Sequence, residues 1–265
     1  MTRSKKNFKA LLLAAGLGTR LKPLTENWPK CLMPIGDTPL LEYWLYYLKE
    51  ANIENVLINI HHHSNFVLDF LKRPHLNFAK SVYEERLLGT AGTLINNYNY
   101  LKGNTILLIH ADNWTNTFLN DFIEFHFKSR PKECSITMML FHTETPESCG
   151  IVELNINNIV TKFHEKQKNN FGNLANAAIY ILEPEVLEWI IKRPWISDFT
   201  TEVIPYFIGK IATWTMKSDF RDIGTIEALK KSQRDIKPIL KWNNNDSWSL
   251  DYKDKIVNKL NLNIE

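Results

Sequence analysis

The first half of the chain alternates short apolar runs with longer amphipathic segments. An apolar run of a strand's length predicts a strand buried on both faces, and apolar residues at helical spacing predict helices between such strands. This alternation predicts a largely parallel sheet with helices on both of its faces. Strands are expected at 8–15, 55–61, 78–85, 105–112 and 135–142, and helices at 39–51, 64–72, 118–128 and from residue 92 onward.

The rhythm changes after about residue 143, where strand-like runs follow one another with few helices between them. The first half is therefore α/β and the second half α+β. No glycine- or serine-rich linker separates the two halves. Strands are expected at 150–155, 158–165, 176–182 and 212–217, and helices at 184–192, near 200–208 and from Thr225.

Local signals mark two helix starts and the end of the main domain. Thr38 is a preferred cap residue and Pro39 suits a first helical position, so a helix is expected to begin there. Ser64 is the cap expected for the next helix. The polar, asparagine-rich tail at 233–265 is expected to form a peripheral helix or an oligomer contact.

The composition is that of an ordinary globular chain. The 265 residues are 44% hydrophobic and 23% charged, and the formal net charge is only +3. Because the lysines and arginines are scattered among the acids, no nucleic-acid partner is expected. No apolar run reaches the roughly 18 residues that a membrane span needs, so no membrane insertion is expected.

The cysteines and the N-terminus indicate a reducing compartment. Cys31, Cys134 and Cys149 are odd in number and irregular in spacing, so a disulfide framework is not expected. The apolar run near the start leads directly into Gly16 and Gly18, which is typical of a core strand and not of a signal peptide. We therefore expect a cytoplasmic protein.

The loop from Gly16 to Lys30 has the composition of an anion-binding loop. In an open α/β sheet a ligand lies at the carboxyl ends of the strands, where this loop begins. Glycines let backbone N–H groups approach an anion, and Arg20 and Lys30 can add charge-assisted contacts to phosphate oxygens. The P-loop pattern is absent, and the dinucleotide pattern GxGxxG lacks its third glycine because Leu21 stands there. Taken alone, the loop predicts either a polyphosphate ligand held by neither of these arrangements or a glycine turn that carries two solvated cations.

The segment AAGLGTRLKPLTENWPKCLMPI (14–35) resembles the signature of the sugar-1-phosphate nucleotidyltransferases, also called NDP-sugar pyrophosphorylases. Their pattern is roughly G-x-G-T-R-L-x-P-L-T, followed by P-K and a further proline. Later landmarks of the family follow in order, so the resemblance covers about residues 8 to 232. These landmarks are LLGTAG (87–92), Asp112 after an apolar strand, GIVELN (150–155), Glu165–Lys166, Asn176 and Asp222 in RDIGT (221–225).

The resemblance implies a Rossmann-like doubly wound mixed sheet of the GT-A-like kind, with a smaller α+β sugar-binding part. The nucleotidyltransferase domain would span 1–232, with a nucleotide-binding half at about 8–142 and a sugar-binding half at about 143–232. The chain lacks hexapeptide repeats and ends too soon for the C-terminal β-helix of many guanylyltransferases. It is therefore most similar to short bacterial-type members, and a homo-oligomer such as a dimer is expected.

The family reaction implies two anionic substrates and a divalent ion. A sugar-1-phosphate oxygen attacks the α-phosphorus of a nucleoside triphosphate, and an NDP-sugar and pyrophosphate leave. By the resemblance, Arg20 and Lys30 neutralise the phosphates and the transition state, and Asp112 and Asp222 hold Mg²⁺. These four residues are the predicted catalytic set.

The resemblance also implies residues for each substrate. The string GTAG is most similar to mannose-1-phosphate guanylyltransferases, and Gly92 stands where thymidylyl members commonly carry a glutamine. GTP with mannose-1-phosphate or a heptose-1-phosphate is therefore favoured. The predicted nucleotide-binding residues are Ala14, Ala15, Gly16, Leu17, Gly18, Thr19, Arg20, Gly89, Thr90, Ala91 and Gly92. The predicted sugar-phosphate residues are Gly150, Glu153, Glu165, Lys166 and Asn176.

Three alternatives stay open on the sequence. The chain could be a uridylyl- or thymidylyltransferase acting on glucose-1-phosphate or an amino sugar phosphate, or an inactive nucleotide-sugar-binding regulatory subunit. A nicotinamide-dependent oxidoreductase is disfavoured by the missing third glycine. The chain departs from the family pattern at Ala15, Ala111 and Gln167, none of which removes a charged catalytic group.

Two further features suggest other roles. His61, His62 and His63 lie at a predicted strand end without an acidic or cysteine neighbour, which indicates an exposed junction and not a metal site. Trp28 lies within the phosphate loop and is expected to act as a lid.

Overall fold

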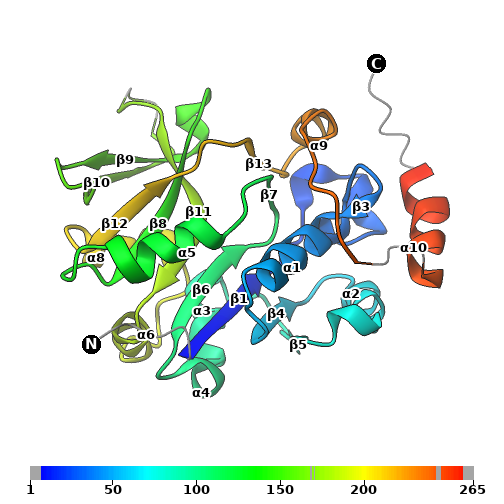
Figure 1. The fold of residues 1–265 in the computed structure, drawn as a ribbon, viewed down its shortest axis with the longest axis horizontal. Helices are drawn as coiled ribbons and strands as arrows, with labels where there is room; N and C mark the ends of the chain where they lie inside the picture. Colours follow the sequence, from blue (N-terminus) through cyan, green and yellow to red (C-terminus); the bar gives the residue numbers. More distant parts are fainter. Residues whose placement is uncertain (1–6, 168, 170, 243–245, 259–265) are drawn as a thin grey trace. The chain divides into compact units, whose positions relative to one another are not determined.

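The chain divides into two compact units, each built from three separate stretches of sequence. The computed structural model describes residues 7–167, 169, 171–242 and 246–258. Unit 1 is formed by residues 1–11, 88–109 and 119–217, and unit 2 by residues 12–87, 110–118 and 218–265. Strands β1 (Phe8–Leu13) and β6 (Thr105–His110) begin in unit 1 and end in unit 2; they are labelled in Figure 1.

Unit 1 contains a mixed sheet with the strand order β10-β9-β11-β6-β1. The long strand β11 is antiparallel to β6, β8 and β9, and β12 runs parallel to β8. The strands are β8 (Ile136–His142), β9 (Gly150–Leu154), β10 (Val160–Glu165), β11 (Leu174–Leu182) and β12 (Ile211–Thr215). The helices are α3 (Thr90–Asn96), α4 (Tyr98–Leu101), α5 (Asn120–Glu124), α6 (Pro184–Ile191), α7 (Phe199–Glu202) and α8 (Ile204–Phe207).

Unit 2 contains a parallel strand pair and two small antiparallel ladders. Strands β4 (Val56–Ile60) and β5 (Ala79–Tyr83) run parallel, and every residue of β4 is buried, Asn59 within its apolar run included. The ladders are β2 (Pro34–Ile35) with β3 (Thr38–Pro39), and β7 (Asn113–Thr115) with β13 (Phe220–Asp222). The helices are α1 (Leu40–Glu50), α2 (Ser64–Leu71), α9 (Ile226–Ser232) and α10 (Ser247–Tyr252).

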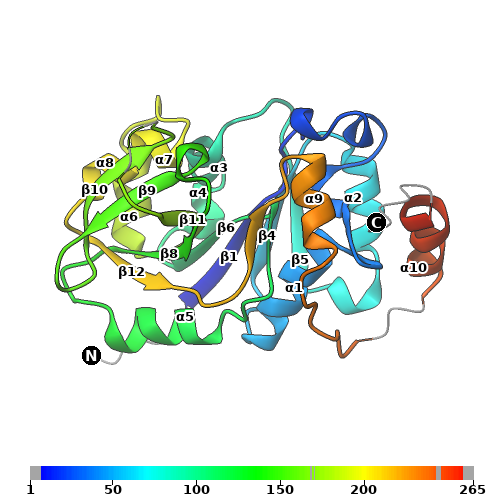
Figure 2. The ribbon, with the colours of Figure 1, turned by 90° about the horizontal axis from the view of Figure 1, so that it is seen from above.

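Part of the tail forms helix α10, which lies against α2. Figures 1 and 2 both show α10, in red, beside α2, in cyan. The rings of Phe70 and Trp248 meet with centroids 5.0 Å apart. The helix therefore packs on unit 2 through aromatic side chains. The last residues of the predicted tail, 259–265, lie outside the described part of the chain.

The predicted mixed α/β fold is confirmed, and the long elements lie close to their predicted positions. Two differences concern length. The segment near 200–208 forms two short helices, α7 and α8, in place of one. The ladder of β7 and β13 was not predicted, because a strand of three residues is too short to show an alternating pattern.

Both predicted helix caps are wrong by one residue or more. Thr38 and Pro39 form strand β3 and pair with Pro34 and Ile35, so α1 starts only at Leu40. Ser64 is the first helical residue of α2, and its cap is His63, whose φ is +53°. At α1, the pairing of the preceding residues as a strand sets where the helix begins.

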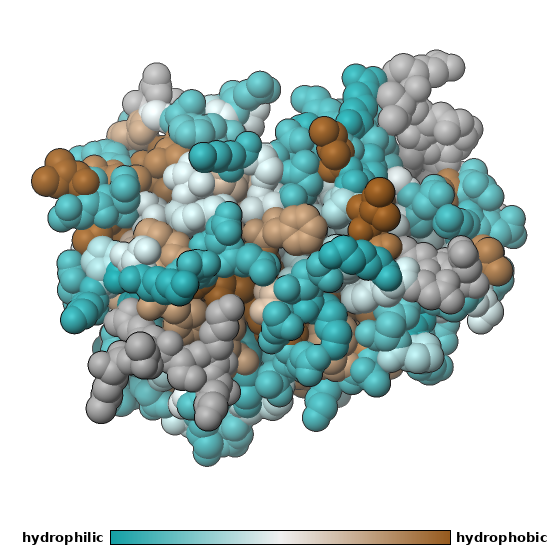
Figure 3. Space-filling view, viewed as in Figure 1, coloured by the Kyte–Doolittle hydropathy of each residue, from teal (hydrophilic) through white to brown (hydrophobic). Residues whose placement is uncertain are grey.

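On the face shown in Figure 3, the apolar side chains of the described residues are dispersed. The face in Figure 3 carries its hydrophobic residues, in brown, as separate small groups among hydrophilic ones, in teal. Among the described residues, no helix combines the length and the apolar character that a membrane crossing requires.

Candidate active site

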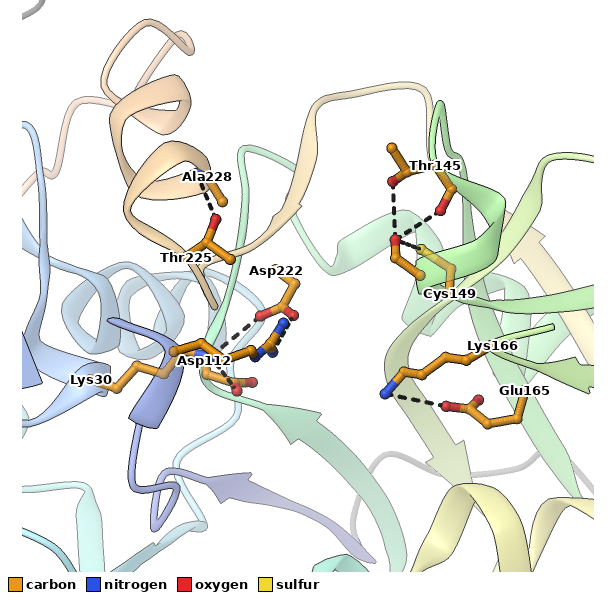
Figure 4. Close-up of polar contacts among 11 residues, drawn as sticks. Lys30, Asp112, Thr145, Cys149, Glu165, Lys166, Asp222, Thr225 and Ala228 are labelled. Atoms are coloured by element: carbon orange, nitrogen blue, oxygen red, sulfur yellow. Dashed lines mark hydrogen bonds and ion pairs between the residues drawn. The ribbon is translucent and has the colours of Figure 1, made fainter. Parts of the chain in front are cut away.

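The four charged residues of the predicted catalytic set meet in unit 2. The ammonium Nζ of Lys30 lies 2.7 Å from Asp112 Oδ2 and 3.3 Å from Asp222 Oδ1. The other oxygen of Asp222 accepts a hydrogen bond from Arg20 Nη2 at 3.1 Å. Figure 4 shows Lys30, Asp112 and Asp222 pointing toward one another. Two cations and two carboxylates thus form one connected cluster.

The ladder of β7 and β13 explains why the two aspartates are neighbours. Asp112 lies between β6 and β7, and Asp222 ends β13, where it pairs with Asn113. The Ile223 N–H donates to the Asp112 carbonyl at 3.1 Å, which extends this pairing by one residue. Sheet spacing therefore sets the distance between the two backbones.

Burial and charge within the cluster are unequal. The side chain of Lys30 is 6% exposed, whereas that of Arg20 is 66% exposed. Burial alone would raise the pKa of Asp112, but the Lys30 ammonium, His110 and the residue's own N–H together hold this pKa below its usual value. Asp112 is therefore ionised at neutral pH, and the buried ammonium has the carboxylate partners that a buried charge requires.

At two glycines beside the cluster a Cβ would meet a neighbouring side chain. Gly18 has a φ of +64°, and a Cβ there would lie 2.8 Å from Thr25 Cγ2. A Cβ at Gly224 would lie 2.5 Å from Arg20 Nη2 and 3.0 Å from Asp222 Oδ1. Gly224 was not predicted as a site residue. Its position in RDIGT, two residues after Asp222, could have indicated a place at the site. It leaves the room that Arg20 needs to reach Asp222.

The predicted nucleotide loop leaves β1 and is shaped by internal hydrogen bonds. The Ala14 N–H donates to Asn59 Oδ1 at 2.7 Å, and the Thr25 hydroxyl donates to the Gly18 carbonyl at 2.8 Å. Asn59 was not predicted as a site residue. Ala15 is buried, and Gly18 is partly buried; the exposed positions are Gly16, Leu17, Thr19 and Arg20. These exposed positions are the ones that a ligand can reach.

The histidines support this loop. His62 Nε2 lies 3.3 Å from the Thr25 carbonyl oxygen, and His63 Nε2 lies 3.0 Å from that of Glu26. His61 to His63 lie at the predicted junction, between β4 and α2, and are half-buried there. The rings brace the turn in which Thr25 holds the loop.

Trp28, the predicted lid, packs against neighbouring rings. Its ring centroid lies 4.6 Å from that of Phe66 and 5.9 Å from that of Tyr252. Its indole N–H donates to the Leu32 carbonyl at 3.0 Å. Trp28 is thus held in place from two sides.

All of the segment LLGTAG except Leu87 lies in unit 1, at the start of α3. The N–H groups of Ala91 and Gly92 donate to the Ser197 carbonyl at 2.8 Å and 3.2 Å. Gly89 has a φ of +79°, and a Cβ there would collide with the same carbonyl. The Phe199 N–H donates to Thr90 Oγ1 at 2.6 Å. The two amides are therefore satisfied by Ser197, a residue that no sequence motif singled out.

Three of the predicted sugar-phosphate residues form a group in unit 1. Glu165 pairs with Gly150 in the ladder of β10 and β9, and a Cβ at Gly150 would lie 2.8 Å from Glu165 Oε2. Lys166 Nζ lies 3.5 Å from Glu165 Oε1, and its side chain is 66% exposed. Figure 4 shows the two side chains meeting at their tips. An exposed ammonium beside a carboxylate suits the recognition of a sugar phosphate.

Glu153 is not brought to this group. It alternates with Gly150 and Val152 along β9 and lies on the other face of the ribbon. Its carboxylate lies 2.8 Å from His164 Nε2 and accepts a hydrogen bond from Lys162 Nζ at 3.1 Å. These two partners lower the pKa of Glu153. The structure thus pairs Glu153 with two residues of the adjacent strand β10.

Asn176 is fixed within β11. Its Nδ2 donates to the Tyr180 hydroxyl at 2.6 Å, and its Oδ1 accepts from the Ala178 N–H at 3.0 Å. Ala178 has a φ of +53°, where the strand is irregular. Burial raises the pKa of Tyr180 well above its usual value, so this buried phenol stays neutral. Tyr180 was missed because a tyrosine in an apolar strand reads as core.

Asp112 and Asp222 have the chemistry of a partial magnesium site. Both carboxylates contact the same ammonium, so they are close enough to share an ion. Mg²⁺ usually takes one or two carboxylates and completes its shell with phosphate oxygens and water. In the described part of the chain, no three His, Cys, Asp or Glu side chains gather as a metal site. A metal at this cluster would therefore need ligands from a bound phosphate and water.

Comparison with known proteins agrees with this arrangement of motifs. The family model described as nucleotidyl transferase matches residues 9–238. Mannose-1-phosphate guanylyltransferase 1 of Arabidopsis thaliana is 34% identical over 193 residues, which cover 70% of this chain and 53% of that relative. The chain thus spans about half the length of this curated relative.

Solved structures show the same fold. HddC from Yersinia pseudotuberculosis, solved in complex with GMP-PN, superposes with a TM-score of 0.70 at 23% identity, covering 85% of this chain and 97% of that one. A UDP-glucose pyrophosphorylase in complex with UDP-glucose gives a TM-score of 0.72 at 21% identity, covering 85% and 96%. Since the family model covers most of the residues, the chain belongs to the nucleotidyl transferase family.

Proposed function

We propose that this protein is a sugar-1-phosphate nucleotidyltransferase. It would convert a nucleoside triphosphate and a sugar-1-phosphate into an NDP-sugar and pyrophosphate by in-line attack at the α-phosphorus. The observation that carries the proposal is the cluster of Arg20, Lys30, Asp112 and Asp222. Joining two anions requires charge neutralisation and alignment more than covalent chemistry, and this cluster supplies both cations and metal ligands.

The proposed roles follow from the exposure of each group. Asp112 and Asp222 would hold Mg²⁺, which when bound neutralises phosphate oxygens. Lys30 is buried and held at two carboxylates, so it would present a fixed charge to a phosphate. Arg20 is exposed, so its side chain could change conformation to contact a bound triphosphate. Removing one such aimed donor costs roughly 3 kcal/mol, or about a hundredfold in rate.

The proposed substrates are GTP and mannose-1-phosphate, with a heptose-1-phosphate as the other candidate sugar. The name of the Arabidopsis relative and the string GTAG support guanylyl transfer. The structural similarity to a UDP-glucose pyrophosphorylase keeps uridylyl or thymidylyl transfer as the second candidate. Glu165, Lys166 and Gly150 are the unit 1 residues that we propose for the sugar phosphate, with the loop at 14–20 and residues 89–92 for the nucleotide.

Several wider features also remain proposals. We propose a nucleotidyltransferase domain at 1–232, with halves at about 8–142 and 143–232, and a tail at 233–265. We further propose a homo-oligomer in the cytoplasm that supplies nucleotide sugars for polysaccharide synthesis. The odd number of cysteines supports a reducing compartment such as the cytoplasm.

Pyrophosphate release with Mg²⁺ tests the reaction and names the substrates together. GTP, UTP, dTTP, CTP and ATP are each paired with mannose-, glucose-, N-acetylglucosamine- and heptose-1-phosphate. We expect one strong signal, with GTP and mannose-1-phosphate. A strong signal with UTP or dTTP would keep the reaction and overturn the base assignment. No signal from protein that still binds a nucleotide sugar would favour the inactive regulatory subunit.

A further inference from the structure

The turn that carries Lys30 has little support of its own. It is the short 3-10 turn η4 (Lys30–Leu32), closed by hydrogen bonds from the Leu32 N–H to Pro29 O and from the Met33 N–H to Lys30 O, each 3.0 Å long. Pro29 and Met33 on either side are extended, each with a ψ of 139°. A 3-10 turn of three residues is weak in isolation. The place of Lys30 therefore depends on what holds this turn.

Two side chains hold the turn at one atom, the Leu32 carbonyl oxygen. The Tyr252 hydroxyl donates to it at 2.8 Å and the Trp28 indole N–H at 3.0 Å. A carbonyl oxygen has two lone pairs, so these two donors satisfy it. Leu32 is fully buried and Tyr252 is 3% exposed, so water has poor access to replace a lost donor.

Tyr252 belongs to α10, and this helix is anchored by a buried guanidinium. Arg73 donates to Asp246 Oδ2 at 2.9 Å, to Ser249 Oγ at 2.8 Å and to Glu42 Oε2 at 2.7 Å. Asp246 also caps the helix by accepting the Ser249 N–H at 2.9 Å. The side chains of Arg73 and Glu42 are 3% and 2% exposed. Breaking this network would leave a buried charge uncompensated, so the helix is firmly placed.

Aromatic contacts also fix the position of the Tyr252 ring. Trp248 packs against Phe70 of α2 and stacks on Tyr252, with centroids 5.1 Å apart and planes 14° from parallel. Contacts therefore run without a break from Arg73 through α10 to the Leu32 carbonyl. That carbonyl lies two residues from Lys30.

We propose that Tyr252 is a positioning residue for Lys30. Through the Leu32 carbonyl, the C-terminal helix α10 holds the turn in the place where the Lys30 ammonium meets Asp112 and Asp222. The inference rests on the proposed function only in giving Lys30 a part in the reaction. The placement of Lys30 itself can be measured without turnover.

Chemical labelling measures that placement directly. Trace acetylation with acetic anhydride is followed by mass spectrometry of the Lys30 peptide, with Lys22, whose side chain is 60% exposed, as the internal reference. Tyr252→Phe keeps the ring and removes only the hydroxyl. We expect its Lys30 to be labelled about threefold faster or more, because one hydrogen bond to the turn is lost.

Thr213→Val is the matched control. The Thr213 hydroxyl, in β12 of unit 1, also belongs to a buried residue and also donates to a carbonyl, that of Asn158, at 2.8 Å. Its loss should lower thermal stability to a similar degree and leave Lys30 labelling unchanged. Trp28→Phe removes the other donor to Leu32 O and should behave like Tyr252→Phe; it replaces that variant if the latter does not fold.

Turnover provides the second measurement. Tyr252→Phe should lower kcat about two- to tenfold with little change in the KM for the nucleotide, since Lys30 acts on the transition state. Unchanged Lys30 labelling in folded Tyr252→Phe and Trp28→Phe would overturn the inference. Equal acceleration in Thr213→Val would also overturn it. Faster labelling in a protein whose wild type has no transferase activity would instead overturn the proposed function and leave the positioning role standing.

Discussion

Lys30 shows how burial makes a single charge decisive. Its ammonium is 6% exposed and contacts one carboxylate at 2.7 Å and another at 3.3 Å. A buried charge depends on its carboxylate partners, because water cannot reach it to take their place. The ion pairs of Lys30 therefore contribute more to stability than an exposed ion pair such as that of Lys22 and Glu26, whose side chains are 60% and 52% exposed.

Asp112→Asn tests the proposed metal role at the residue scale. We expect turnover to fall by at least about a hundredfold, because a neutral amide is a poor magnesium ligand. Circular dichroism should show an intact fold. Asp219→Asn makes the same chemical change at an exposed residue beside β13 and should keep near wild-type turnover. Near wild-type turnover in Asp112→Asn would show that the metal assignment is wrong.

The two glycines of the nucleotide loop should differ sharply. Gly18→Ala places a Cβ 2.8 Å from Thr25 at a φ of +64°, and we expect it to lower the free energy of unfolding by about 1–2 kcal/mol. Gly16→Ala meets no atom within 4 Å and should change stability little. Urea denaturation compares the two variants. Equal stability would mean that the loop does not hold Gly18 in this conformation.

At the element scale, the long elements were predictable and the short ones were not. The strand at 56–60 and the helix at 184–191 carry an apolar pattern long enough to recognise. The two strands that bring Asp112 and Asp222 together have three residues each and pair across about a hundred positions of sequence. Their register comes from tertiary contacts, which no local pattern contains.

The candidate site divides in the same way. The charged residues of the catalytic set were identified from motifs, and the structure brings them together. The sequence could not show that the amides of Ala91 and Gly92 contact Ser197, or that Glu153 faces away from Glu165. Those outcomes depend on which partner lies nearest in the fold.

The docking of α10 should depend on pH. Burial would raise the pKa of Asp246, but the Ser249 N–H and Arg73 lower it below its usual value of 3.8. A lowered folded pKa gives stability that is present above the unfolded pKa and is lost as pH falls through the folded pKa. We therefore expect Asp246→Asn to be less stable than wild type at about pH 6, with the difference shrinking below about pH 4.

Thermal unfolding at a series of pH values measures this difference. Glu144→Gln, at an exposed turn of unit 1, is the control and should show no such convergence. A gap between Asp246→Asn and wild type that stays constant through the acid range would contradict the role given to the Asp246 carboxylate.

At the scale of the whole molecule, substrate binding should stabilise the protein. GTP with Mg²⁺ at about 100 times its Kd should raise the free energy of unfolding by about 2.7 kcal/mol. Thermal unfolding with GTP, with and without EDTA, measures this gain. We expect EDTA to remove much of it, because phosphates and aspartates would share the ion. The Asp112→Asn variant should show no difference on EDTA addition, and a full Mg²⁺ effect in that variant would place the metal elsewhere.

Arg20 and Asp222 are 202 residues apart, and this separation bears on how the protein is made. Synthesis delivers Lys30 well before β13, α9 and α10, which begin about 190 residues later in the sequence. Until then the nascent chain holds a lysine destined for burial without one of its carboxylates and without the tyrosine that braces its turn. Unit 2 therefore reaches its final form only after β13, α9 and α10 have been released.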